Sequence, residues 1–124
     1  MQNLYCKIFV DTEITTTELL DLVRRIAHGE RQIIRTVAST DYEADIVDND
    51  DFDPAKSSDA EDGFLFYRYY LDVVPTNQTS REAYIKQVGD LLEGLWQHGC
   101  GAVAACSFED ELPRRGGYRN PNHA

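Results

Sequence analysis

The chain has 124 residues, which suffice for one domain with its own hydrophobic core, and it carries a formal net charge of −10. It has no apolar run long enough to span a membrane, and its first residues lack the basic flank and cleavage site of a secretory signal. These features argue against a membrane-spanning protein and predict a cytoplasmic location.

The first half of the chain predicts two strands and a helix. Leu4 to Val10 is short, apolar and rich in β-branched and aromatic residues, as strands are. Thr15 and Glu18 then form a capping box, apolar residues recur at helical spacing, and Gly29 supplies a left-handed stop, so we expect a helix over residues 16–28. A strand over residues 32–39 follows, with a continuation through residues 44–47.

The second half repeats this pattern. Phe64 to Val74 is the strongest strand signal in the chain. Thr79 and Glu82 form a second capping box, which predicts a helix that ends at Gly99. The apolar residues 102–108 read as a last strand.

This order of elements, β-α-β-β-α-β, predicts an α+β fold. It closes most simply as the ferredoxin-like arrangement, a four-stranded antiparallel sheet with two helices on one face, which leaves the other face uncovered. We expect residues 1–112 to form this single domain and residues 113–124 to be a flexible basic tail.

The negative charge is concentrated in one segment. Residues 41–62 hold ten acidic residues against Lys56 alone. Asp, Ser, Ala and Pro dominate residues 48–63, so we expect a long exposed acidic loop there. The carboxylates that we expect to bind a partner are Asp48, Asp50, Asp51 and Asp53.

A calcium site in this loop is not predicted. An EF-hand loop needs glycine at its sixth position and glutamate at its twelfth. Counting from Asn49, Pro54 is sixth, and counting from Asp48, Asp59 is twelfth. We therefore expect no resident metal and no cofactor.

The uncovered face of the sheet is predicted to be aromatic. Side chains alternate along a strand, and the more apolar set from Leu65 to Val73 should face the helices. The residues left on the open face are Tyr5, Lys7, Phe9, Phe64, Phe66, Arg68, Tyr70 and Asp72, of which Phe9, Phe64, Phe66, Arg68 and Tyr70 are the candidates for binding. Exposed apolar patches usually mark a contact, so this face is a candidate for binding a partner. The alternatives are a homodimer through the sheet face, or a loop or tail that folds over the patch using Phe52 or Tyr118.

Two short stretches resemble the RNA recognition motif. IFVD, residues 8–11, is similar to the signature on the first strand of that family, and GFLFYRY, residues 63–69, to the signature on its third. The resemblance implies that Phe9, Phe64 and Phe66 stack on bases. Asp62 stands where the family has a basic residue, however, and the acidic loop should repel phosphates.

The chain as a whole, including VAACSFEDELP at residues 103–113, resembles small acidic immunity proteins of bacterial polymorphic toxin systems. The resemblance implies a non-catalytic inhibitor of a companion toxin, often a nuclease with a basic cleft. An acidic loop would speed the encounter with such a cleft, while buried aromatic side chains would prolong the contact.

Catalytic signatures are missing from the sequence, which contains no H-E-x-x-H, G-x-S-x-G or phosphate-loop pattern. His28 and His98 fall at the ends of predicted helices, where a cap is their simplest role. Cys6, Cys100 and Cys106 match no zinc spacing and are expected to be reduced, although Cys100 or Cys106 beside His98 leaves a small enzyme as an alternative. We expect a binding module for a basic protein and no enzyme; nucleic-acid binding is the other alternative.

Overall fold

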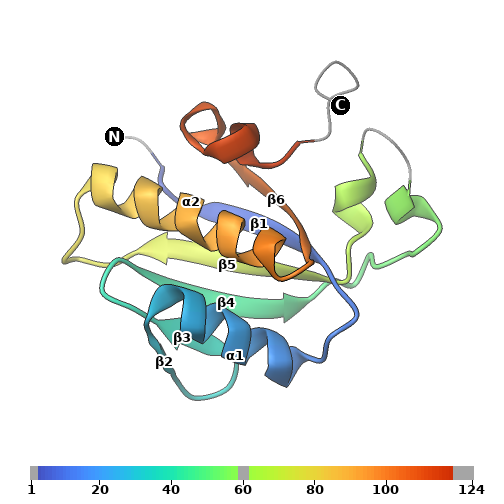
Figure 1. The fold of residues 1–124 in the computed structure, drawn as a ribbon, viewed down its shortest axis with the longest axis horizontal. Coiled ribbons are helices and arrows are strands. Elements are labelled where there is room, and N and C mark those ends of the chain that lie inside the picture. Colours follow the sequence, from blue (N-terminus) through green and yellow to red (C-terminus); the bar gives the residue numbers. More distant parts are fainter. Residues whose placement is uncertain (1–2, 59–61, 119–124) are drawn as a thin grey trace.

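Two helices cover one face of an antiparallel sheet in the computed structural model, which describes residues 3–58 and 62–118 (Figure 1). The α+β class and the placement of both helices on one face agree with the sequence. The sheet has six strands, however, in the order β2-β3-β4-β5-β1-β6, and every neighbouring pair is antiparallel. The strands are β1 (Cys6–Asp11), β2 (Glu30–Arg31), β3 (Thr36–Ala38), β4 (Tyr42–Asp48), β5 (Tyr69–Pro75) and β6 (Gly101–Cys106).

The expectation of four strands was wrong because the segment after the first helix turns twice. Gln32 donates its backbone N–H to the carbonyl of Thr36 (2.8 Å), which closes a hairpin between β2 and β3. Ser39 then binds the carbonyl of Tyr42 through both its N–H (2.9 Å) and its hydroxyl (3.0 Å) and turns the chain into β4. The single strand expected over residues 32–39 is therefore a hairpin tip and one short strand.

The helix α1 (Thr16–Ala27) begins where its capping box predicted. The Thr15 hydroxyl accepts from the N–H of Glu18 (3.2 Å), and the Glu18 carboxylate accepts from the N–H of Thr15 (3.0 Å). At the other end His28, with φ 52°, takes the left-handed conformation that the sequence assigned to Gly29. Gly29 is needed because a Cβ there would lie 2.4 Å from the carbonyl oxygen of Ala38 on β3.

The helix α2 (Arg81–Gln97) has a different cap from the one predicted. Ser80 is the N-cap and accepts from the N–H of Ala83 (3.1 Å). Thr79, the predicted cap, donates instead to the carboxylate of Asp41 (2.8 Å) and so fastens the start of the helix to the turn before β4. His98 caps the far end, where its Nδ1 lies 2.8 Å from the carbonyl oxygen of Gly94.

The core lies between the sheet and the helices. Alternation along β5 is as predicted from Tyr69 on, since Tyr69, Leu71 and Val73 are all buried. Tyr84 of α2 is fully buried, and its hydroxyl donates to the carbonyls of Leu4 (2.6 Å) and Val73 (3.2 Å). This side chain joins the helix to β5 and to the segment that leads into β1.

Residues 113–118 are not the flexible tail that the sequence predicted. The short helix η3 (Glu109–Glu111) and the turn η4 (Pro113–Gly116) follow β6. Gly116 and Gly117 have φ 85° and 91°, and a Cβ at either would lie within 3 Å of a β6 carbonyl oxygen. Two glycines that adopt this conformation therefore let the chain press against the edge of the sheet. The rest of the predicted tail, residues 119–124, lies outside the described residues.

Candidate protein-interaction surface

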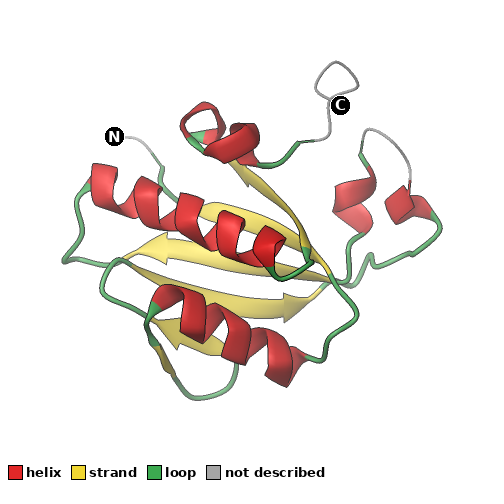
Figure 2. Ribbon diagram, in the orientation of Figure 1, coloured by secondary structure: helices red, strands yellow, loops and turns green. Residues whose placement is uncertain are grey.

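The acidic segment is folded where the structure describes it. Residues 48–58 and 62–68 contain the short helices η1 (Lys56–Ser58) and η2 (Gly63–Phe66). Figure 2 shows these turns beyond the ends of the strands, away from the two long helices. Gly63 is buried against this turn, and a Cβ there would lie 2.6 Å from the carbonyl oxygen of Ser57, so only glycine fits. The predicted long exposed loop is thus folded on itself in the described part; residues 59–61 lie outside it.

Asn49 holds this segment against the entry to β5. Its side-chain amide donates to the carbonyls of Leu65 (3.0 Å) and Tyr67 (2.7 Å), and its backbone N–H donates to the carbonyl of Arg68 (2.9 Å). Its side-chain oxygen accepts from the N–H of Asp51 (3.0 Å). Asn49 is 9% exposed, so these bonds are shielded from water.

The four predicted carboxylates have different surroundings. Asp48 pairs with Arg35 across a distance of 3.1 Å. The Asp53 carboxylate accepts from the N–H groups of Ala55 (3.0 Å) and Lys56 (3.3 Å) and so caps a turn. Asp50 and Asp51 are exposed. These last two carboxylates are the best placed to meet a partner.

Phe64 and Phe66 do not lie on a strand, contrary to prediction. The last residues of β4 and β1 that pair with β5, Asp48 and Val10, both lie opposite Tyr69. Residues before Tyr69 would have no strand beside them, and the side-chain amide of Asn49 donates to the carbonyls of two of these residues, Leu65 and Tyr67. The chain therefore leaves the sheet, which places Phe64 and Phe66 in η2 and Arg68 in the connection.

An aromatic cluster forms instead on the open face of the sheet, and it consists of Phe9, Phe64, Tyr70 and Tyr118. The ring of Phe64 meets the rings of Phe9 (centroids 5.4 Å apart) and Tyr118 (5.2 Å) edge to face. Phe9 is only 5% exposed as a result. Loop and tail thus cover part of this face, as one of the alternatives from the sequence expected for Tyr118.

Cations lie over the rings that remain near the surface. Lys7 Nζ lies 4.1 Å from the ring centre of Tyr70. The guanidinium of Arg68 lies 4.8 Å from the ring centre of Phe52, which is 39% exposed. Such contacts satisfy the ring faces and fix the side chains in place. Of the predicted aromatic surface, Phe64, Phe66 and Tyr70 are half-buried and Phe9 is buried, whereas Phe52, which the sequence offered as a cover for this surface, is exposed.

The hairpin tip, Ile33 and Ile34, is an apolar feature that the sequence reading missed. These isoleucines are 87% and 80% exposed, the highest values among the exposed large apolar side chains of the described residues. The carbonyl of Arg35, the next residue, accepts from the N–H of Ile46 (2.9 Å), and its guanidinium pairs with Asp48. The hairpin tip and the acidic segment are therefore neighbours at one end of the sheet.

One signal in the sequence could have indicated this tip. Two adjacent isoleucines in a strand point to opposite faces, so one of them would have lain on the side away from the helices. Arginines at positions 31 and 35 bracket the pair, which leaves few apolar residues to extend a buried strand in either direction.

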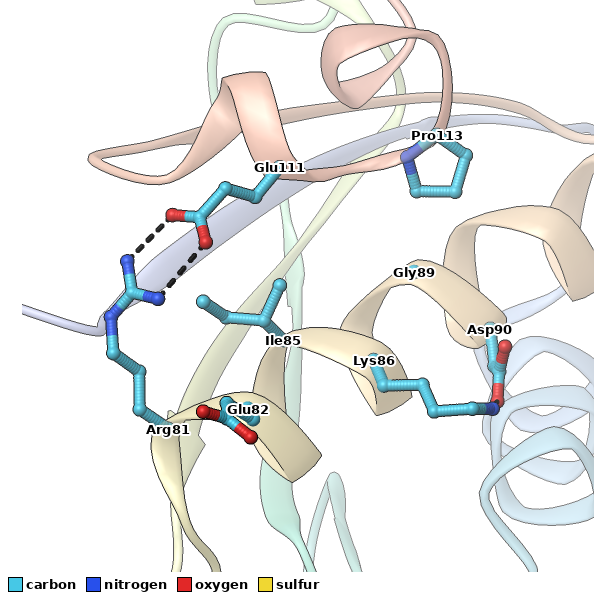
Figure 3. A pocket seen from close by; sticks show the side chains of 8 residues that line it. All are labelled: Arg81, Glu82, Ile85, Lys86, Gly89, Asp90, Glu111 and Pro113. Carbon is cyan, nitrogen blue, oxygen red and sulfur yellow. Dashed lines mark hydrogen bonds and ion pairs between the residues drawn. The ribbon is translucent and has the colours of Figure 1, made fainter.

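A groove of about 420 Å³ lies between α2 and the segment after β6 (Figure 3). Four of its charged side chains form two ion pairs: Arg81 binds both oxygens of Glu111 (2.9 and 2.6 Å), and Lys86 binds Asp90 (3.0 Å). The remaining lining residues include Ile85, Gly89 and Pro113. No histidine or cysteine is among the described residues that line it.

The histidine and cysteine that the sequence offered as a small enzyme's site, His98 and Cys100, both have structural roles. His98 is occupied at the end of α2, and Cys100 is buried, where burial raises the pKa of its thiol and a hydrogen bond with Thr12 lowers it less. Within residues 3–58 and 62–118 no cluster of three or more His, Cys, Asp or Glu side chains could hold a metal ion. No helix of that part is long and apolar enough to cross a membrane.

Comparison of the chain with protein-family models, with curated proteins and with solved structures finds no match.

Proposed function

We propose that this protein is a non-enzymatic binding module that recognises a basic protein partner, in the manner of an immunity protein that neutralises a toxin. The observation that carries the proposal is the adjacency of two exposed isoleucines and a folded acidic segment. The ion pair between Arg35 and Asp48 links the residue after the isoleucines to the first residue of the acidic segment, and we propose that Ile33, Ile34, Asp50, Asp51 and Phe52 act together as one surface. We call it the tip surface.

The tip surface combines two physical roles. Apolar side chains that are almost fully exposed gain the most when a partner covers them, because burial removes their area from water. Carboxylates beside them attract a positively charged partner and orient it before contact. A basic protein with an apolar pocket fits both features.

The proposal also accounts for the elements that carry the tip surface. The strands β4, β5, β1 and β6, with α1 and α2, follow the β-α-β-β-α-β order of the ferredoxin-like arrangement. We propose that they are that unit and that the β2–β3 hairpin is an addition at its edge. The hairpin then supplies the two isoleucines that the central unit lacks.

Nucleic-acid binding is not part of the proposal. Stacking on a base requires an accessible ring face. Phe9 is 5% exposed and lies under the edge of Phe64, and neither Phe64 nor Phe66 is on a strand. The carboxylates of the acidic segment would also repel the phosphates of a nucleic acid.

The test uses tagged protein to capture a partner from the native cell, followed by binding kinetics with the captured protein. The double variant Asp50→Asn/Asp51→Asn should slow association several-fold at low ionic strength. Ile33→Ser/Ile34→Ser should speed dissociation by about tenfold or more, since exposed anchors act mainly on the lifetime of a complex.

Two matched controls separate this surface from the others. Glu93→Asn/Asp110→Asn removes the same charge from exposed positions away from the hairpin and should leave both rates unchanged. Val74→Ser removes an apolar side chain, 43% exposed, from the open face of the sheet. Kinetics that respond to Val74→Ser and not to the isoleucine variant would move the interface to the sheet face. A dimer of this chain, in place of another protein, would contradict the proposal.

A further inference from the structure

Cys6 and Cys106 lie directly opposite each other on β1 and β6. Opposite residues of an antiparallel pair have Cα atoms about 4.5 or 5.5 Å apart, and both values fall in the range of about 4.4–6.8 Å that disulfides require. Both thiols face the helices: Cys6 is fully buried, and Cys106 packs against the same core. The Cys6 S–H is within hydrogen-bonding reach of the Cys106 sulfur.

The two thiols differ in access. Cys106 is the last residue of β6, is only partly buried, and precedes the exposed Ser107. The hydrogen bond from Cys6 lowers the pKa of Cys106, and the same bond together with burial raises the pKa of Cys6. A thiolate that reaches solvent is the nucleophile in disulfide exchange. Cys106 is therefore the thiol that reacts first.

Cys100 has no part in this pair. It precedes β6 at the opposite end from Cys106, which places it about 20 Å away along the strand. It is 5% exposed and hydrogen-bonded with Thr12. A bridge from Cys100 to either of the other thiols would break the sheet.

We propose that Cys6 and Cys106 form a thiol–disulfide modification site that takes a small-molecule disulfide as its oxidant. In the first step the Cys106 thiolate attacks one sulfur of the disulfide, forms a mixed disulfide and releases one small thiolate. In the second step the Cys6 thiol gives up its proton and attacks the Cys106 sulfur, which releases the second small thiolate. The protein loses two protons and two electrons, and the small disulfide takes them up and becomes two thiols.

The product joins the first strand to the last. A crosslink between residues so far apart in the chain restricts the unfolded ensemble strongly, so it should raise the melting temperature by an amount on the order of 10 °C. Neither cysteine is part of the tip surface, so this inference stands apart from the proposed function. In a reducing compartment a crosslink of this kind forms only transiently, under oxidation.

The experiment exposes the reduced, folded protein to glutathione disulfide and then blocks remaining thiols with an alkylating agent. Intact mass and peptide mapping of the unaltered chain should show loss of two hydrogens and a Cys6–Cys106 link, with a higher melting temperature. Cys100→Ala should behave identically and is the matched control. Cys6→Ala should stop at a glutathione adduct on Cys106, and Cys106→Ala should give neither product.

Other results would overturn the inference. These are a linked peptide that contains Cys100, adduct formation on Cys106→Ala at the rate of the unaltered chain, or thiols that stay reduced until the chain is unfolded with urea. The mapping is made on the unaltered chain, so it decides the question even where a variant fails to fold.

Discussion

Asn49 is the residue on which the conformation of the acidic segment depends. Ten carboxylates within residues 41–62 repel one another, and the segment contains little that could form a core. The buried amide of Asn49 compensates by binding two carbonyls of the chain that returns to β5. The sequence could not reveal this role, because an asparagine between aspartates is also typical of an ordinary turn.

Asn49→Ala should lower the free energy of unfolding by about 1–3 kcal/mol. The change leaves the carbonyls of Leu65 and Tyr67 without their donor in a shielded site. Urea titration of the variant gives this value directly. Asn77→Ala, at an exposed position in the loop before α2, is the matched control and should change stability by less than about 0.5 kcal/mol. Equal effects at the two positions would mean that Asn49 does not organise the segment.

Tyr42 should make the fold sensitive to alkaline pH. Burial, aided by the charges of Asp90 and Asp41, raises the pKa of Tyr42 above its ordinary value. In the unfolded chain the Tyr42 hydroxyl ionises at about pH 10. The stability that neutral Tyr42 contributes is therefore complete below that pH, and it is lost as the pH rises toward the pKa of Tyr42 in the folded protein. The loss should approach about 1.4 kcal/mol per pH unit.

Tyr42→Phe removes this ionisation and keeps the ring. Urea titrations at about pH 8 and about pH 11 should show a smaller loss of stability for Tyr42→Phe than for the unaltered chain. Parallel losses in the two proteins would show that the unfolding at high pH has another origin.

At the scale of elements, the two helices, the central strands and β6 were readable from the sequence, and the β2–β3 edge of the sheet was not. The helix α1 was predicted to within a residue, because a capping box and helical spacing are local signals. The strand β5 begins five residues later than expected, since its start depends on where the neighbouring strands end. The β2–β3 hairpin escaped for a similar reason, because its turn is fixed by pairing with β4.

The backbone conformation of Ile34 should lower the free energy of unfolding. This residue has φ 71°, a left-handed conformation that β-branched residues rarely adopt. Ile34→Gly should therefore raise the free energy of unfolding by about 1 kcal/mol, whereas Ile33→Gly, whose φ is not positive, should give no gain. Denaturant titration of both variants makes the comparison. A loss of stability in Ile34→Gly would show that the side chain supports the fold, which would weaken its assignment to a partner.

At the scale of the whole molecule, the segment after β6 completes the fold. Tyr118 contacts Phe64, and the guanidinium of Arg114 lies 4.6 Å from the ring centre of Trp96. The sequence suggested a loose tail because residues 113–118 show no apolar period, and their contacts are made with residues far away in the chain. The candidate carboxylates could be predicted from composition, whereas the exposure of Ile33 and Ile34 depends on the β2–β3 hairpin, of which the sequence gives only one sign, the isoleucine pair between two arginines.

Ending the chain at residue 112 should therefore lower stability by about 1–3 kcal/mol, the combined size of an aromatic pair and a cation–π contact in a partly buried site. A chain that ends at residue 118 keeps both contacts and is the matched control. Thermal and urea unfolding of the two truncated proteins test the difference. Equal stability would restore the boundary that the sequence predicted.

The pairing of β1 with β6 has a consequence for biosynthesis. Cys6 lies opposite Cys106, so β1 leaves the ribosome one hundred residues before its second neighbour is complete. Contacts between such distant segments slow folding, because the intervening chain has to be ordered first. Until then one edge of β1 is bare, and a nascent chain stalled before residue 101 would be a natural client for a chaperone.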